Sequence, residues 1–129
     1  MIWLRVLLCA IALFVGITFA MDPEDEEFYR RVFEEVDPDF ILDNERILNS
    51  YLKCFYSEGD CNRHAEVVKE SIPDVLKTVC GRCTPKQKEI FKYSLNKFIP
   101  AHPKEWDKML SIYDPTGEYW PNVKAYIES

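Results

Sequence analysis

The chain has 129 residues, 47% of them hydrophobic, with 16 basic and 22 acidic residues and a formal net charge of −6 at pH 7. This length suits one domain and is short for two. An acidic chain lacks the clustered positive charge that nucleic acids and anionic membranes attract, so neither is an expected partner.

Residues 1–20 have the pattern of a secretory signal peptide. Arg5 is followed by an apolar run over residues 6–17 and by the small-residue exit Thr18-Phe19-Ala20. The run is shorter than the roughly 20 apolar residues that span a membrane, so we expect export without membrane insertion. Removal of this segment leaves 109 residues, with 15 basic against 22 acidic side chains, or a net charge of −7.

An acidic segment over residues 21–36 precedes the expected ligand-binding domain at 37–129. Its first part, residues 22–27, is almost entirely acidic and is expected to be solvated and frayed. Phe28, Val32 and Val36 then recur at every fourth residue. That spacing allows an additional helix packed on the body, and the sequence leaves this open.

The remaining chain predicts an all-α fold of five or six short helices. Apolar residues recur at offsets of three, four and seven, which is the pattern of amphipathic helices. The stripes are Leu48, Tyr51, Leu52 and Phe55; Val68, Ile72, Val75, Leu76 and Val79; Phe91, Leu95, Phe98 and Ile99; Trp106, Met109, Leu110 and Tyr113; and Tyr119, Val123 and Ile127.

Proline, glycine and capping residues mark the ends of these helices. Asp37-Pro38 and Thr84-Pro85 each place a capping side chain before a proline at the first helical position. Gly81 stands where the stripe that ends at Val79 should stop, and Pro100 and Pro103 are expected to bracket a turn. Pro73 lies inside a stripe, so a kink or a break is expected there.

Four cysteines remain once Cys9 leaves with the signal peptide, which indicates two disulfides in an exported chain. They are Cys54, Cys61, Cys80 and Cys83. Three pairings are open, and the short gaps favour neighbours. A zinc site is disfavoured because the first gap is wide for a zinc knuckle. A thioredoxin-like role for the Cys-Gly-Arg-Cys tetrapeptide is disfavoured because no strand precedes it.

The cysteine spacing and the sequence motifs around it resemble those of the insect chemosensory protein family. The matching motifs are Ile41-Leu42-Asp43-Asn44-Glu45-Arg46, Glu58-Gly59-Asp60-Cys61, Ile72-Pro73-Asp74-Val75-Leu76, Cys83-Thr84-Pro85-Lys86-Gln87-Lys88, Trp106-Asp107-Lys108-Met109-Leu110 and Tyr113-Asp114-Pro115-Thr116-Gly117. The resemblance implies six helices around an internal apolar channel and the pairs Cys54–Cys61 and Cys80–Cys83. It also implies a carrier of long-chain alcohols, acids and esters, with Tyr51 and Trp106 as pocket aromatics. The acidic start departs from the usual pattern, which leaves the cover of the channel mouth undefined.

We therefore expect an extracellular, monomeric carrier of semiochemical-like ligands. The Tyr51 hydroxyl is the candidate partner for a ligand's polar end. The alternative is a signalling or structural protein that acts through protein–protein contacts. The residues expected to line the site are Leu42, Leu48, Tyr51, Val68, Ile72, Leu76, Phe91, Leu95, Phe98, Trp106 and Leu110.

Catalysis finds little support in the sequence. The two histidines, His64 and His102, lie in no recognisable nucleophile or metal motif, and His64 reads as part of a solvated turn beside Asp60 and Glu66. We expect no enzyme activity, no metal and no cofactor. No Asn-x-Ser/Thr acceptor is present, so N-glycosylation is not expected.

Overall fold

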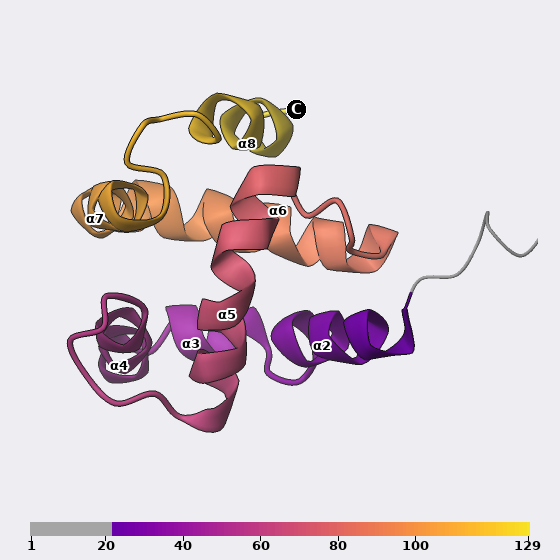
Figure 1. Ribbon diagram of the computed structural model, residues 1–129. Coiled ribbons are helices and arrows are strands. Elements are labelled where there is room, and N and C mark those ends of the chain that lie inside the picture. Colours follow the sequence, from indigo (N-terminus) through magenta and orange to yellow (C-terminus); the bar gives the residue numbers. More distant parts are fainter. Residues whose placement is uncertain (1–21) are drawn as a thin grey trace, which may run out of the picture.

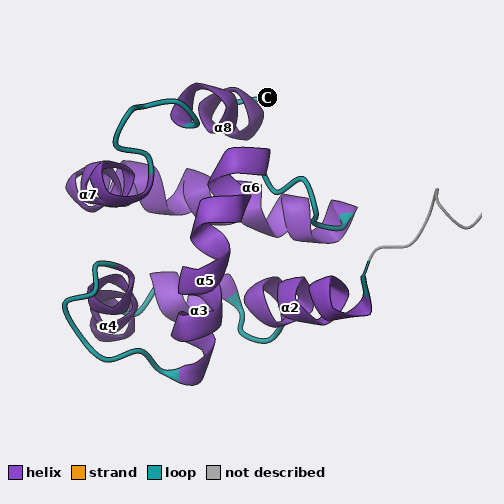
Figure 2. Ribbon diagram, in the orientation of Figure 1, coloured by secondary structure: helices purple, strands orange, loops and turns teal. Residues whose placement is uncertain are grey.

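The computed structural model describes residues 22–129, and the expected signal peptide lies outside them. Within this range all regular structure is helical, as the stripes predicted (Figure 2). The helices are α2 (Pro23–Glu34), α3 (Pro38–Leu42), α4 (Glu45–Phe55), α5 (Arg63–Thr78), α6 (Pro85–Ala101), α7 (Pro103–Tyr113) and α8 (Trp120–Ile127). None of the described helices is long and apolar enough to cross a membrane.

Two groups of helices are joined by α5. In Figure 1, α2, α3 and α4 lie on one side and α6, α7 and α8 on the other, with α5 running between the two groups. Contacts of α5 with α2 and α4, and of α6 with α2, α3, α7 and α8, close the bundle. The core therefore forms where the apolar stripes of the two groups face each other.

Side-chain caps explain where several helices begin. Asp37 accepts a hydrogen bond from the Asp39 amide at 2.9 Å and starts α3. Thr84 and Gln87 form a reciprocal capping box at the start of α6. Both starts agree with the sequence prediction, because a capping oxygen satisfies an amide that has no partner within the helix.

Prolines disturb the helices less than the sequence predicted. Helix α5 continues through Pro73 to Thr78, so a break at that position does not occur. Helix α6 likewise continues past Pro100 to Ala101, and the turn before α7 shrinks to His102 alone. Packing of the apolar faces outweighs the one backbone hydrogen bond that each proline removes.

The end of α5 differs from the prediction that placed it at Gly81. Val79 is the cap and adopts a left-handed conformation with φ 54°, and Cys80 follows with φ 55°. This region is uncommon for residues other than glycine and costs a β-branched side chain most. The helix stops here because the Val79 and Cys80 amides both return to the Val75 carbonyl.

The open question about the acidic segment is settled by α2. Asp22 caps this helix by accepting from the Glu24 amide at 3.0 Å, and the acidic first turn lies at the positive end of the helix dipole. Tyr29 and Val32 are buried against the body. The acidic start is thus a structured turn and not a frayed one.

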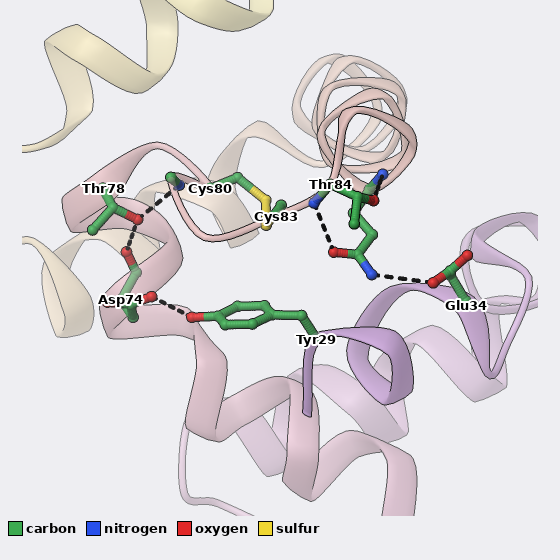
Figure 3. Close-up of a disulfide and its surroundings, with 9 residues drawn as sticks. Tyr29, Glu34, Asp74, Thr78, Cys80, Cys83 and Thr84 are labelled. Atoms are coloured by element: carbon green, nitrogen blue, oxygen red, sulfur yellow. Dashed lines mark hydrogen bonds between the residues drawn. A yellow bond between two sulfur atoms is a disulfide. The ribbon is translucent and has the colours of Figure 1, made fainter. Parts of the chain in front are cut away.

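Two disulfides flank α5, with the neighbour pairing that the resemblance implied. Cys54 bonds to Cys61 across a Cα–Cα distance of 4.9 Å, between the end of α4 and the loop before α5. Cys80 bonds to Cys83 across 5.3 Å in the loop after α5 (Figure 3). Each bridge closes a short loop at one end of α5 and joins no elements that are distant in the sequence.

Candidate ligand-binding cavity

A cavity of about 220 Å³ lies among α2 to α7. Its wall contains all eleven residues that the sequence placed there, from Leu42 on α3 to Leu110 on α7. The wall also contains residues outside that expectation: Val32, Phe33, Val36, Pro38, Ile41, Leu52, Phe55, His64, Ser71, Val75, Ser94 and Met109. The surface that they form is overwhelmingly apolar.

The acidic N-terminal segment supplies one side of this wall. Val32 and Phe33 come from the last turns of α2, and Val36 follows the helix end. The composition of this segment predicted that it would lie outside the ligand-binding domain. Its placement answers how the cavity is covered: the apolar face of α2 closes it, and the acidic face points outward.

Helix α2 is held to the body by polar contacts as well. Tyr29 donates a hydrogen bond to the Asp74 carboxylate on α5 (Figure 3). Near its other end, Glu34 accepts a hydrogen bond from the buried Gln87 side chain at 3.1 Å and pairs with Lys86 at 3.3 Å. The wall formed by α2 therefore depends on contacts that pH and salt can weaken.

The main polar feature of the wall is a chain of hydrogen bonds through His64. Its Nδ1 lies 2.9 Å from the Tyr51 hydroxyl, and its Nε2 lies 3.1 Å from the Val32 carbonyl oxygen. His64 is only 8% exposed and Tyr51 only 5%. The sequence predicted a solvated turn around His64, and this was wrong because α2 packs over the start of α5. The sequence did contain an indication that His64 is buried, because His64 extends the apolar stripe of α5 one turn before Val68.

The Tyr51 hydroxyl remains protonated at neutral pH. Burial is the main cause that raises its pKa, and the charge of Glu35 adds to the effect. The side chain of Asn62 acts in the opposite direction and lowers this pKa. A neutral phenol can donate its proton to His64 and still accept a hydrogen bond from another group.

Trp106 forms an aromatic part of the wall on α7. Its ring packs edge-on against Phe98 and Trp120, with centroids 6.4 Å and 5.4 Å away. Trp106 is 5% exposed, and its indole nitrogen is the buried side-chain polar atom without a hydrogen-bond partner among the described residues. A fluorescence signal from Trp106 will therefore be coupled to the neighbouring Trp120.

Few other polar groups interrupt the wall. Ser71 donates its hydroxyl proton to the Val68 carbonyl at 2.7 Å, so it is satisfied within its own helix. No cluster of three or more potential metal-binding side chains occurs in residues 22–129. The arrangement suits an apolar molecule with one small polar end.

Comparison with known proteins identifies relatives among insect proteins. The chain is 38% identical over 94 residues to the "Putative odorant-binding protein A10" of Drosophila melanogaster, covering 73% of this chain and 61% of that protein. It therefore spans less than two thirds of the length of this relative. It is 32% identical over 104 residues to "Ejaculatory bulb-specific protein 3" of the same species, covering 81% and 82%.

Two solved structures share the fold. The "Chemosensory Protein in Complex with bromo-dodecanol" superposes with a TM-score of 0.66 at 27% identity, covering 78% of this chain and 97% of that one. The antennal chemosensory protein A6 of the moth Mamestra brassicae superposes with a TM-score of 0.62 at 26% identity, covering 72% and 91%. The resemblance found in the sequence is thus confirmed by fold.

The family itself follows from a sequence profile. The profile of the "Insect pheromone-binding family, A10/OS-D" matches residues 29–121, from the middle of α2 to the start of α8. This is a family of chemosensory and odorant-binding carriers and not of enzymes. The chain belongs to the insect pheromone-binding family A10/OS-D, whose members include the insect chemosensory proteins.

Proposed function

We propose that this protein binds one long-chain apolar molecule in its internal cavity and carries it outside the cell as a monomer. The observation that carries the proposal is the cavity of about 220 Å³ with an almost wholly apolar wall. For comparison, an engineered cavity of about 150 Å³ with Leu, Ile and Phe walls stays dry and binds benzene. The volume lies below the roughly 300–1,000 Å³ of typical ligand pockets, which favours a slender chain over a bulky ring system.

The energetics support moderate affinity. Burial of about twelve methylenes contributes roughly 10 kcal/mol at about 0.8 kcal/mol each. Lost translational and rotational freedom costs at least about 4 kcal/mol. The remainder, roughly 6 kcal/mol, corresponds to a dissociation constant on the order of 10–100 µM. This range suits a carrier that must also release its ligand.

The structural relative solved with bromo-dodecanol supports the same ligand class. We assign the contact surface to the eleven wall residues predicted from the sequence, with His64 and the α2 residues Val32 and Phe33 added. The Tyr51 hydroxyl is the proposed contact for the polar end of the ligand. The proposed location of the protein outside the cell agrees with the expected signal peptide and with the two disulfides.

The test is displacement of the apolar dye N-phenyl-1-naphthylamine by straight-chain C8–C18 alcohols. Ile72 lies in the cavity wall, whereas Ile112 on α7 is 43% exposed and lies outside it. Ile72→Phe should fill part of the cavity and exclude one or two methylenes. We expect a roughly 4- to 15-fold weaker affinity for long chains and an optimum at shorter ones.

Ile112→Phe is the matched control, because the same substitution at an exposed position leaves the cavity unchanged. Its affinities should equal those of the unmodified protein. Equal binding by both variants would place the ligand elsewhere on the molecule. Failure of the dye and every alcohol to bind would refute the carrier function and favour a role in protein–protein contact.

A further inference from the structure

We propose that the cavity selects ligands whose polar end donates a hydrogen bond, because His64 already holds the proton of Tyr51. The ligand class is then long-chain alcohols, in preference to ethers, esters, aldehydes and carboxylates of equal length. This inference rests on the proposed function and narrows it. It follows from the hydrogen-bond chain that joins Tyr51, His64 and Val32.

The first step fixes the proton on His64. The Val32 carbonyl lies in the last turn of α2, which ends at Glu34, so it has no amide donor within the helix. A carbonyl oxygen can only accept, and His64 Nε2 lies 3.1 Å from it. Nε2 must therefore carry the proton of the neutral imidazole. His64 thereby caps the C-terminal end of α2.

The second step fixes the proton on Tyr51. With its proton on Nε2, the neutral imidazole presents an unprotonated Nδ1, which can only accept. The Tyr51 hydroxyl lies 2.9 Å from Nδ1 and donates to it. Both side chains are more than nine-tenths buried, so water does not compete for this bond.

The third step gives the chemistry offered to a ligand. Once its proton is committed to His64, the Tyr51 oxygen has only acceptor capacity left. A hydroxyl group can donate to this oxygen. At Tyr51 an ether, ester or aldehyde oxygen meets another acceptor, and a carboxylate brings a charge that burial disfavours. The indole N–H of Trp106, which has no partner among residues 22–129, is a donor contributed to the wall by α7, so the preference for a donating ligand belongs to the Tyr51 end of the cavity.

The experiment compares two isomers, 1-dodecanol and 1-methoxyundecane, with dodecane as the apolar reference. The two isomers have the same atoms and nearly the same length, but only the alcohol can donate. Dye displacement is measured at pH 8, above the ordinary titration range of histidine. Affinities are divided by the partition of each compound into hexadecane, which removes the differences in hydration. This scale compares the hydrogen bond with an apolar medium and not with water, so the alcohol should exceed the ether by at least about 10-fold.

His64→Leu is the decisive variant because it releases the Tyr51 proton. The freed hydroxyl can then donate to an ether oxygen, so 1-methoxyundecane should bind more tightly relative to dodecane than it does to the unmodified protein. The double variant Tyr51→Phe with His64→Leu lacks both polar side chains and keeps the Val32 carbonyl, so it supplies the baseline that includes any hydrogen bond to that carbonyl. A merely structural role of His64 would change the affinity of all three compounds by one common factor.

The outcomes separate the two levels of the proposal. An alcohol preference that disappears in His64→Leu, with a gain for the ether, supports the inference. Binding of all three compounds with no alcohol preference in the unmodified protein overturns it and leaves the carrier function standing. Should His64→Leu not fold, the hexadecane-corrected preference of the unmodified protein decides alone. Absence of any binding, including that of dodecane, overturns the carrier function itself.

Discussion

The first and last helices of the described chain pack on the same neighbour in different ways. Figure 1 shows α2 and α8 on opposite sides of α6. Helix α2 contributes to the cavity wall, and polar contacts of Tyr29 with Asp74 and of Glu34 with Gln87 add to the packing of its buried face. Helix α8 buries Val123 and Ile127 completely or nearly so, and the cavity wall described above contains none of its residues.

This difference separates stability from ligand access. The apolar packing of α8 contributes to the free energy of unfolding without touching the site. The polar contacts of α2 contribute less but hold a wall that a ligand touches. Substitutions at α8 should therefore lower stability with unchanged selectivity, whereas substitutions at α2 should change ligand exchange at a small cost in stability.

The largest effect is expected from Val123→Ala on α8. Val123 is 0% exposed, and its two lost methyl groups remove about 1.6 kcal/mol of burial before the cost of the cavity left behind. We expect the free energy of unfolding to fall by roughly 2–3 kcal/mol in urea titrations. The relative affinities for different chain lengths should stay the same. A change in those ratios would contradict the separation of α8 from the site.

The next effect concerns the start of α8. Asp114 is buried and accepts hydrogen bonds from the Tyr119 amide at 3.1 Å and the Trp120 amide at 2.9 Å. Asp114→Ala leaves both amides unpaired and should cost roughly 1–2 kcal/mol. Asp114→Asn keeps one acceptor oxygen and should lose less. Equal losses of stability in Asp114→Ala and Asp114→Asn would show that the charge of Asp114 matters and its capping hydrogen bonds do not.

A smaller effect is expected at α2 from Tyr29→Phe. The change removes the hydrogen bond to Asp74 and keeps the buried ring, so stability should fall by about 0.5–1.5 kcal/mol. Amide hydrogen exchange in α2 should accelerate while that of α8 stays constant. Ligand dissociation should also become faster, because α2 opens more often. Uniform acceleration over the chain would contradict local opening of α2.

Tyr29 also predicts an alkaline response. Burial is the first cause that raises its pKa, and the hydrogen bond to Asp74 is the second. A raised pKa contributes stability that is complete below the ordinary tyrosine value of about 10 and is lost as the pH rises above it. The alkaline loss of stability should be shallower in Tyr29→Phe. Stopped-flow pH jumps followed by circular dichroism would measure this alkaline loss of stability.

The smallest effect is expected from Glu34→Gln. The hydrogen bond from Gln87, followed by that from Lys86, lowers the pKa of the Glu34 carboxyl. A lowered pKa contributes stability that is present above the ordinary glutamate range and is lost as the pH falls through the lowered value. In Glu34→Gln the free energy of unfolding should change less with pH in the acid range. At low pH it should nearly equal that of the original protein. Added salt should reduce the remaining difference.

The sequence predicted the cavity wall well because helical periodicity reports the buried face directly. Tyr51, Ile72 and Trp106 each lie on a stripe, and stripes of neighbouring helices must meet in a small bundle. The resemblance of the motifs around the cysteines to a known family supplied the pairing of the two disulfides. Periodicity says which residues are inside, but it does not say which helix covers which.

The residues that the sequence missed depend on that arrangement. His64 is buried because α2 lies over the start of α5; its spacing from Val68 indicates an inward face, but it does not indicate which helix covers that face. Val79 ends α5 in a conformation that its side chain disfavours, because the Cys80–Cys83 loop and the packing around it determine the backbone there. Tertiary context decided both positions.

The short span of the disulfides has a consequence for biosynthesis. The paired cysteines are separated by only 7 and 3 positions, and Cys80–Cys83 can meet without any helix–helix contact. Short loops close on a submicrosecond timescale, and the entropic cost of closure rises with loop length, so distant pairings form less often. Oxidation can therefore precede docking of the helices. The nascent chain should reach its native connectivity with little help from a disulfide isomerase.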